Sequence, residues 1–343
     1  MKSFLPKDKV FIIAEAGVNH NGKLTLAKKL VDAAKQAGAD AVKFQTFKTE
    51  NLVSGQAPLA VYQKNNKQNR AKNQRELIKA LELPFGEFIK LKNHCDRKKI
   101  LFLSTPFDFE SADFLEKLGI SFYKIPSGDI DNLPFLQHIA QKRIPIILST
   151  GMSYLKEVKE AVNAIYKTGN RDLALLHCTT EYPTPFHEVN LKAIDTLKKI
   201  FNVPVGYSDH TLGIEVAVAA AARGSRIIEK HITLDHNMKG PDHKASLEPS
   251  QFQAMVGSIR HIEAALGNGI KAPTASEKKN IPVARKSLVA LERIEKGEKT
   301  TYRKISFKRP GSGISPKELH RVIGRTAKVS IPKDHLILWK DLL

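Results

Sequence analysis

Eight short apolar segments recur along the first two thirds of the chain, and each is separated from the next by enough residues for a helix. We predict strands at residues 10–14, 41–44, 100–103, 121–125, 144–148, 173–177, 203–206 and 226–230. Helical patterns fill the intervals, for example at 24–37, 84–98, 111–118, 154–166, 191–200 and 214–223. Regular β–α alternation favours a parallel sheet, and eight such units favour closure into a (β/α)₈ TIM barrel, an α/β fold. A doubly wound open sheet is the alternative.

The alternation stops near residue 270, where the segment 267–274 has the composition of a linker. Beyond it the predicted elements are short and separated by turns. We therefore predict a catalytic barrel over 1–270, a linker over 271–283 and a small, mostly-β domain over 284–343. The long polar connection 46–75 is predicted to lie as a loop over the mouth of the barrel, because long connections of this kind tend to be functional.

The chain is basic, with 55 Lys and Arg against 35 Asp and Glu and a net charge of +20. Such a charge suits nucleic acid, a membrane surface or an anionic substrate. The lysines are spread along the chain and form no basic run interleaved with aromatic residues, which disfavours nucleic acid. No segment approaches the ~18 apolar residues of a membrane span, and the first residues lack the apolar core of a signal peptide. With only two cysteines, we expect a cytoplasmic protein that binds an anionic small molecule.

In barrel enzymes the functional side chains follow the carboxyl ends of the strands. Ammonium and hydroxyl groups suited to phosphate or carboxylate oxygens occur there at Lys43, Thr105, Lys124, Ser127, Ser149 and Ser208. His210 and His231 end adjacent predicted strands, so we predict that they share a divalent metal whose other positions are left to water or substrate. Two imidazoles suit Mn²⁺ better than an all-oxygen Mg²⁺ site. The alternative is a pair of hydrogen-bonded core histidines.

A carboxylate at the rim of the first strand, Glu15, is the leading acid/base candidate. Its alternative role is an ion pair with a lysine of the rim.

Taken together, these segments resemble the sialic acid synthase family over nearly the whole chain. The matching segments are IAEAGVNHNG (13–22), KFQT (43–46), STPF (104–107), KIPSG (124–128), LSTGM (148–152), HCTTEYP (177–183), GYSDHT (206–211), EKH (229–231) and GPDH (240–243). The tail from Ala284 resembles the antifreeze-protein-like domain of the same family, with KRPG at 308–311.

The resemblance implies a phosphoenolpyruvate-dependent transferase that uses a divalent metal, with Mn²⁺ favoured and Mg²⁺ or Co²⁺ as alternatives. It implies metal ligation by His210 and His231 and a catalytic carboxylate at Glu15. It places phosphoenolpyruvate on Lys43, Thr105, Lys124, Ser127, Ser149 and Ser208. It places the acceptor sugar on Gln45, Thr180, Tyr182, Asp242 and, from the partner of a domain-swapped homodimer, Arg309.

Two positions bear on the acceptor. Family members that act on N-acetylmannosamine often carry Asn where this chain has Thr180, and Glu where it has Asp129. The sequence around Thr180 looks more like the branch that uses 2,4-diacetamido-2,4,6-trideoxymannose. A related synthase with a sugar-phosphate acceptor is the alternative, and it would need a second phosphate site at Lys64, Lys67, Arg70 or Lys72. Nucleic-acid binding through the basic charge is a further alternative, from another functional class.

Overall fold

The computed structural model describes residues 5–6, 8–58 and 73–343. The chain divides into two compact units, Met1–Gly267 and Asn268–Leu343. Within the part of the chain that the structure describes, no helix is long and apolar enough to cross a membrane.

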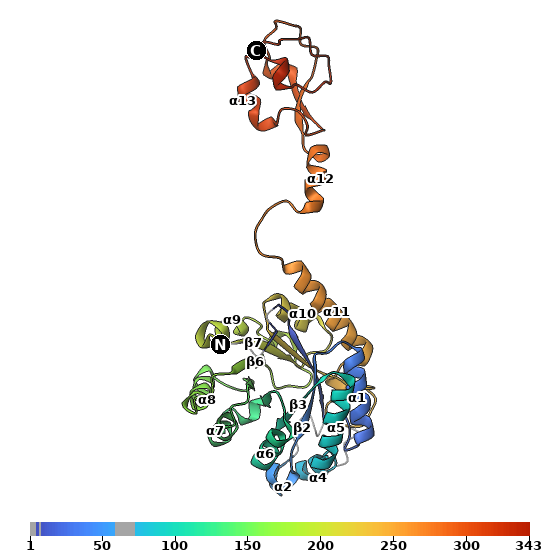
Figure 1. The fold of residues 1–343 in the computed structure, drawn as a ribbon, viewed down its shortest axis with the longest axis vertical. Coiled ribbons are helices and arrows are strands. Elements are labelled where there is room, and N and C mark those ends of the chain that lie inside the picture. Colours follow the sequence, from blue (N-terminus) through green and yellow to red (C-terminus); the bar gives the residue numbers. More distant parts are fainter. Residues whose placement is uncertain (1–4, 7, 59–72) are drawn as a thin grey trace. The chain divides into compact units, whose positions relative to one another are not determined.

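Eight parallel strands form the centre of the first unit (Figure 1). Their bounds are β1 Phe11–Gly17, β2 Ala41–Thr46, β3 Leu101–Pro106, β4 Tyr123–Ile125, β5 Ile146–Ser149, β6 Leu173–Cys178, β7 Val205–Asp209 and β8 Ile227–His231. They are ordered β3-β2-β1-β8-β7-β6-β5-β4, and the two ends of this order, β3 and β4, pack against each other. The strands therefore form a nearly closed barrel, which confirms the predicted fold and excludes the open sheet.

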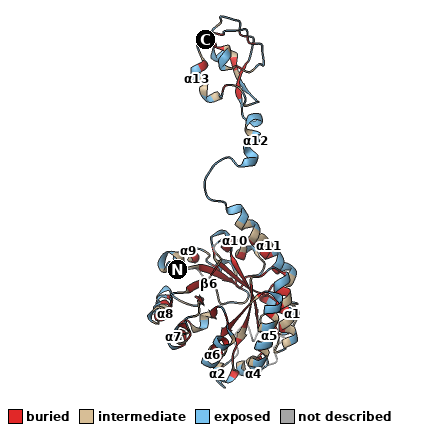
Figure 2. Ribbon diagram, viewed as in Figure 1, coloured by how far each residue is buried: buried red, intermediate tan, exposed pale blue. Residues whose placement is uncertain are grey.

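Helices surround the barrel and turn one buried face toward it (Figure 2). They are α1 Leu24–Gln36, α2 Thr49–Leu52, α4 Gln74–Lys79, α5 Phe85–Lys98, α6 Phe109–Leu118, α7 Leu133–Gln141, α8 Leu155–Lys167, α9 Ala193–Phe201, α10 Glu215–Ala222 and α11 Pro249–Leu266. In α8 the buried residues Val158, Ala161, Val162 and Ile165 recur at the helical period, so one stripe packs inward and the rest is solvated. The connection 46–75, predicted as a loop, contains α2, and its residues 59–72 lie outside the described residues.

The barrel strands bury both of their faces. One face joins the helices in the main core, with Ile12 and Ala14 of β1 as examples, and the other fills the barrel interior, with Phe11 and Ile13. Because successive strand residues point to opposite sides, the interior series of each strand continues at every second residue toward its carboxyl end.

The second unit has a core of its own. Strands β9 Ser287–Ala290 and β10 Ile305–Lys308 pair antiparallel, and α12 Ala275–Ala284 and α13 Leu319–Val322 are its helices. Leu288, Ile305 and Ile337 are among its buried residues. The range 271–283, expected as a linker, contains most of α12. A small, mostly-β region after the barrel is confirmed.

Candidate functional site

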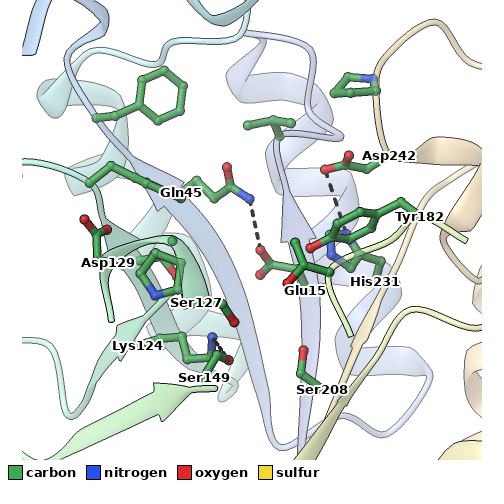
Figure 3. A pocket seen from close by; sticks show the side chains of 18 of the residues that line it. Glu15, Gln45, Lys124, Ser127, Asp129, Ser149, Tyr182, Ser208, His231 and Asp242 are labelled. Carbon is green, nitrogen blue, oxygen red and sulfur yellow. Dashed lines mark hydrogen bonds and ion pairs between the residues drawn. The ribbon is translucent and has the colours of Figure 1, made fainter. Parts of the chain in front are cut away.

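A cavity of about 620 Å³ lies at the carboxyl ends of the strands (Figure 3). The structure brings every site residue predicted in the barrel to its wall: Glu15, Lys43, Gln45, Thr105, Lys124, Ser127, Ser149, Thr180, Tyr182, Ser208, His210, His231 and Asp242. Arg309 belongs to the second unit, where it is exposed. The alternative phosphate ligands Lys64, Lys67, Arg70 and Lys72 lie outside the described residues.

The strand period explains why these side chains converge. On β1, Ile13 fills the barrel interior, and Glu15, two residues later, reaches the cavity. The same step leads from Ala41 to Lys43 on β2 and from Leu103 to Thr105 on β3. In each of these strands, the inward-facing side chain nearest the carboxyl end therefore lies at the mouth of the barrel.

Two lysines and two carboxylates form the floor of the cavity. Lys43 Nζ lies 2.9 Å from Glu15 Oε2 and 3.7 Å from Glu229 Oε2, and it donates to Thr105 Oγ1 at 3.1 Å. Lys124 Nζ lies 3.6 Å from Glu229 Oε1 and donates to Ser149 Oγ at 2.8 Å. The ion pair that was the alternative role for Glu15 is therefore present, yet Glu15 also lines the cavity.

Glu229 is the functional residue that the sequence analysis missed. It sits between Ile227, which fills the barrel interior, and His231, and it accepts a hydrogen bond from Ser208 Oγ at 3.0 Å. The step of two residues from Ile227 was the signal in the sequence that could have assigned it to the cavity.

The two carboxyl groups of the floor have opposite pKa shifts. Burial raises the pKa of Glu15 to about 7, against the opposing effect of Lys43. Burial also acts to raise the pKa of Glu229, but Lys124 and Lys43 outweigh it and lower that pKa to about 2. Near neutral pH, Glu229 is ionised, whereas Glu15 is present in both its protonated and its ionised form. Two neighbouring carboxyl groups whose environments give them very different pKa values are typical of acid/base sites.

The two histidines lie side by side, with ring centroids 5.5 Å apart. His210 Nδ1 donates to the Thr179 carbonyl at 2.7 Å, so its lone pair is on Nε2, which lies 3.5 Å from Ser208 Oγ. His231 Nδ1 is buried, has no hydrogen-bond partner among the described residues and lies 4.0 Å from Asp242 Oδ2 (Figure 3). Burial lowers the pKa of both rings, so both are neutral and can bind a metal.

The described residues contain no cluster of three or more His, Cys, Asp or Glu side chains that could hold a metal ion. The protein ligands would therefore be the imidazoles of His210 and His231, and a metal bound to them would take its remaining ligands from water or substrate. The metal stays a prediction.

The barrel residues assigned to the sugar come from β2 and from the loops after β6 and β8. Gln45 Nε2 donates to Glu15 Oε1 at 3.3 Å, and the ring of Tyr182 lies 4.3 Å from that of His210. Burial raises the pKa of Asp242 to about 6. The loop of Asp242 needs glycine at 240, because a Cβ there would come within 2.6 Å of the buried His243 ring.

Comparisons with known proteins identify the family of the chain. A model of the NeuB family matches residues 30–271, and a model of the SAF domain matches residues 285–343. The chain is 50% identical over 331 residues to N,N'-diacetyllegionaminic acid synthase of Campylobacter jejuni, covering 96% of this chain and 99% of that protein. It is 35% identical over 330 residues to human N-acetylneuraminate-9-phosphate synthase, covering 96% of this chain and 91% of that protein.

Among solved structures, it is similar to N-acetylneuraminic acid (sialic acid) synthetase of Leptospira borgpetersenii. The sequence identity is 38% and the TM-score 0.71, over 80% of this chain and 90% of that one. The resemblance inferred from the motifs is confirmed, and the chain belongs to the NeuB family, with a SAF domain after its barrel.

Proposed function

We propose that this protein condenses phosphoenolpyruvate with the aldehyde form of an N-acetylated mannose-type sugar and water. The products are a nine-carbon 2-keto acid and phosphate. The acceptor is N-acetylmannosamine or 2,4-diacetamido-2,4,6-trideoxymannose, and the identity to the legionaminic acid synthase of Campylobacter jejuni supports the second. The observation that carries the proposal is the pair of buried lysines, Lys43 and Lys124, set among hydroxyl donors on the cavity floor.

The floor suits a donor that carries phosphate and carboxylate groups. Lys43 and Lys124 supply fixed positive charge in a desolvated place, where charge-assisted hydrogen bonds are strong. Thr105 and Ser149 are buried and accept hydrogen bonds from Lys43 and Lys124, which leaves their hydroxyl protons for the anion. Ser208 is also buried, and its hydroxyl donates to Glu229 in this structure. Ser127 also lines the floor.

The pair His210 and His231 supports a divalent metal, with Mn²⁺ favoured over Mg²⁺ or Co²⁺. The unpartnered Nδ1 of His231 and the anchored ring of His210 fit that role. A bound ion would polarise the aldehyde oxygen and orient the acceptor.

Glu15 lies where donor and acceptor would meet, between Lys43 and Gln45. C3 of phosphoenolpyruvate attacks the aldehyde carbon and forms a carbon–carbon bond, while protonated Glu15 gives its proton to the aldehyde oxygen. The cation left at C2 takes up water, and ionised Glu15 accepts one proton of that water. The C2–O bond to phosphate then breaks, the hydroxyl proton leaves with phosphate, and a 2-keto acid remains. A pKa near neutrality suits a residue that acts first as an acid and then as a base.

We further propose that the acceptor is held by Gln45, Thr180, Tyr182, Asp242 and Arg309 from the second copy in a domain-swapped homodimer. Twofold exchange of the small unit would give each barrel one such arginine. Large apolar side chains are exposed where loops follow β3, β5, β6 and β7, at Phe109, Met152, Tyr154, Phe186 and Leu212. Exposed apolar side chains at this end of the barrel are compatible with a protein partner.

Both cysteines, Cys95 and Cys178, are free and buried, which supports the proposal of a reducing, cytoplasmic location.

The test is phosphate release from phosphoenolpyruvate in the presence of Mn²⁺ and a panel of free and phosphorylated amino sugars. We expect release only with an N-acetylated mannose-type acceptor. Donor labelled with ¹⁸O in the bridging oxygen should transfer the label to phosphate, since the C–O bond breaks. Label retained in the keto acid, or release that does not depend on an acceptor, would contradict the proposal.

A further inference from the structure

One side of the cavity is apolar. Leu52, Leu77, Ile78 and Phe107 line it, backed by the buried residues Val18, Phe47 and Leu81. We call these seven residues the apolar wall. They form a hydrophobic cluster separate from the barrel core, and every member of that cluster lines the cavity. The wall comes from α2, α4 and the loops after β1, β2 and β3.

A packing role alone does not account for the wall. Leu52, Leu77, Ile78 and Phe107 are only partly buried, so part of their apolar surface remains open. Because each of them lines the cavity, a ligand bound there would remove that surface from water. Burial of apolar area stabilises a complex in proportion to the area covered.

The polarity of the cavity changes along single strands. On β2 and its continuation, Lys43, Gln45 and Phe47 all line the cavity, so ammonium, amide and aromatic groups follow one another. On β3, the hydroxyl of Thr105 is followed by the ring of Phe107. A donor anion on the lysines and an aldehyde at Glu15 and Gln45 would leave the remote end of the acceptor at the apolar wall.

The seven residues of the wall carry no charged group that could pair with a charged acceptor. Among the described residues that line the cavity, the basic side chains other than histidine are Lys43 and Lys124, and both belong to the floor. Among the described residues, a phosphate at the wall would find no counter-ion, and a hydroxyl turned against the wall would lose hydrogen bonds to water. Methyl groups carry neither cost.

We propose that the apolar wall selects acceptors whose end remote from the aldehyde carries methyl groups, such as a deoxy carbon at C6 or an acyl methyl, over acceptors with a hydroxyl or phosphate there. This inference rests on the proposed function and adds the specificity determinant of its acceptor site. Leu77 and Ile78 of α4 are the residues best placed to test it, because they lie far along the chain from every residue of the floor.

The experiment compares acceptors that differ only at C6, with CH₃, CH₂OH or CH₂OPO₃²⁻. We expect kcat/KM to be about 10- to 100-fold higher for the methyl acceptor than for the hydroxyl one, the range typical of a pocket that recognises a single group. Ile78→Thr and Leu77→Gln should each reduce this ratio several-fold, mainly by lowering kcat/KM of the methyl acceptor. The KM for phosphoenolpyruvate should not change.

Ile89→Thr is the matched control, because Ile89 is an exposed residue of α5 that does not line the cavity. Phe107→Tyr is a second wall variant that adds one hydroxyl at nearly constant shape, and it should act in the same direction.

The outcomes separate the two proposals. No phosphate release with any acceptor would overturn the proposed function. Release at equal kcat/KM for the methyl and hydroxyl acceptors, or a preference for the phosphorylated one, would overturn only the role of the wall. A ratio that falls equally in the Ile89→Thr control would also overturn it.

Discussion

Replacing Glu15 by Gln should slow turnover and, above about pH 6, stabilise the fold. Glu15 is fully buried, and burial raises its pKa from 4.5 to about 7. The unfolded chain releases this proton near pH 4.5, whereas the folded chain holds it until about pH 7. The stability that Glu15 contributes is therefore complete below pH 4.5 and is lost as pH rises through 7.

The size of the effect follows from that interval. Each pKa unit corresponds to about 1.36 kcal/mol, so the wild-type protein loses up to ~3 kcal/mol of unfolding free energy between pH 4.5 and about 7. Gln carries no charge in either state, so the variant lacks this loss. The difference in unfolding free energy should shift by up to ~3 kcal/mol in favour of Glu15→Gln across that range.

Urea unfolding at several pH values, with a chelator present so that both proteins are metal-free, measures this difference. Circular dichroism is the suitable signal, because the single tryptophan, Trp339, lies in the second unit and does not report on the barrel. Asp8→Asn, at an exposed position outside the helices and strands, is the control and should give a flat difference. If the Glu15→Gln difference is also flat, or shifts toward the wild type with rising pH, the assignment of a protonated Glu15 is refuted. Turnover should fall at least ~10²-fold in the variant.

Three further perturbations test other parts of the site. His210→Ala and His231→Ala should each lower Mn²⁺ affinity at least ~10-fold in calorimetry and remove phosphate release, and full metal affinity in either variant would contradict the metal site. Lys124→Met should raise the KM for phosphoenolpyruvate about 10- to 100-fold and leave the acceptor KM nearly unchanged in initial-rate kinetics, because it removes a charged hydrogen bond to the donor; an altered acceptor KM alone would reassign this lysine. Arg309→Ala should raise the acceptor KM, and mixing it with Glu15→Gln under subunit exchange should restore part of the phosphate release. Mixed dimers without activity would exclude the exchange of Arg309 between copies.

The barrel could be predicted from the sequence because its strands are buried on both faces. Each of the eight apolar segments overlaps a strand, with boundaries that agree to within three residues, since a fully buried strand is read as a continuous apolar run. The residues that end these segments, Lys43 and Ser149 among them, could be assigned to one rim for the same reason.

Other features depend on the closure of the barrel and could not be read from one segment. Glu229 meets Lys43 across β1 and Lys124 across several strands, and these contacts exist only when the sheet is curved. The apolar wall was hidden for a different reason. The polar composition of 46–75 predicts a loop, while Leu52 in α2 and Ile78 in α4 contribute single apolar residues that carry no visible period.

In the proposed reaction, the charge balance of the floor would couple binding of the anionic donor to the protonation of Glu15. Lys43 and Lys124 face Glu229, which is ionised, and Glu15, whose pKa is near 7. An anionic donor bound to both lysines would weaken the attraction that Lys43 exerts on the Glu15 carboxylate and would add negative charge beside it. Both effects raise the pKa of Glu15 further. Binding of the donor would thus favour the protonated form of Glu15, which supplies the proton that the aldehyde oxygen requires. Before the donor binds, Glu229, which the two lysines keep ionised, would balance part of their positive charge.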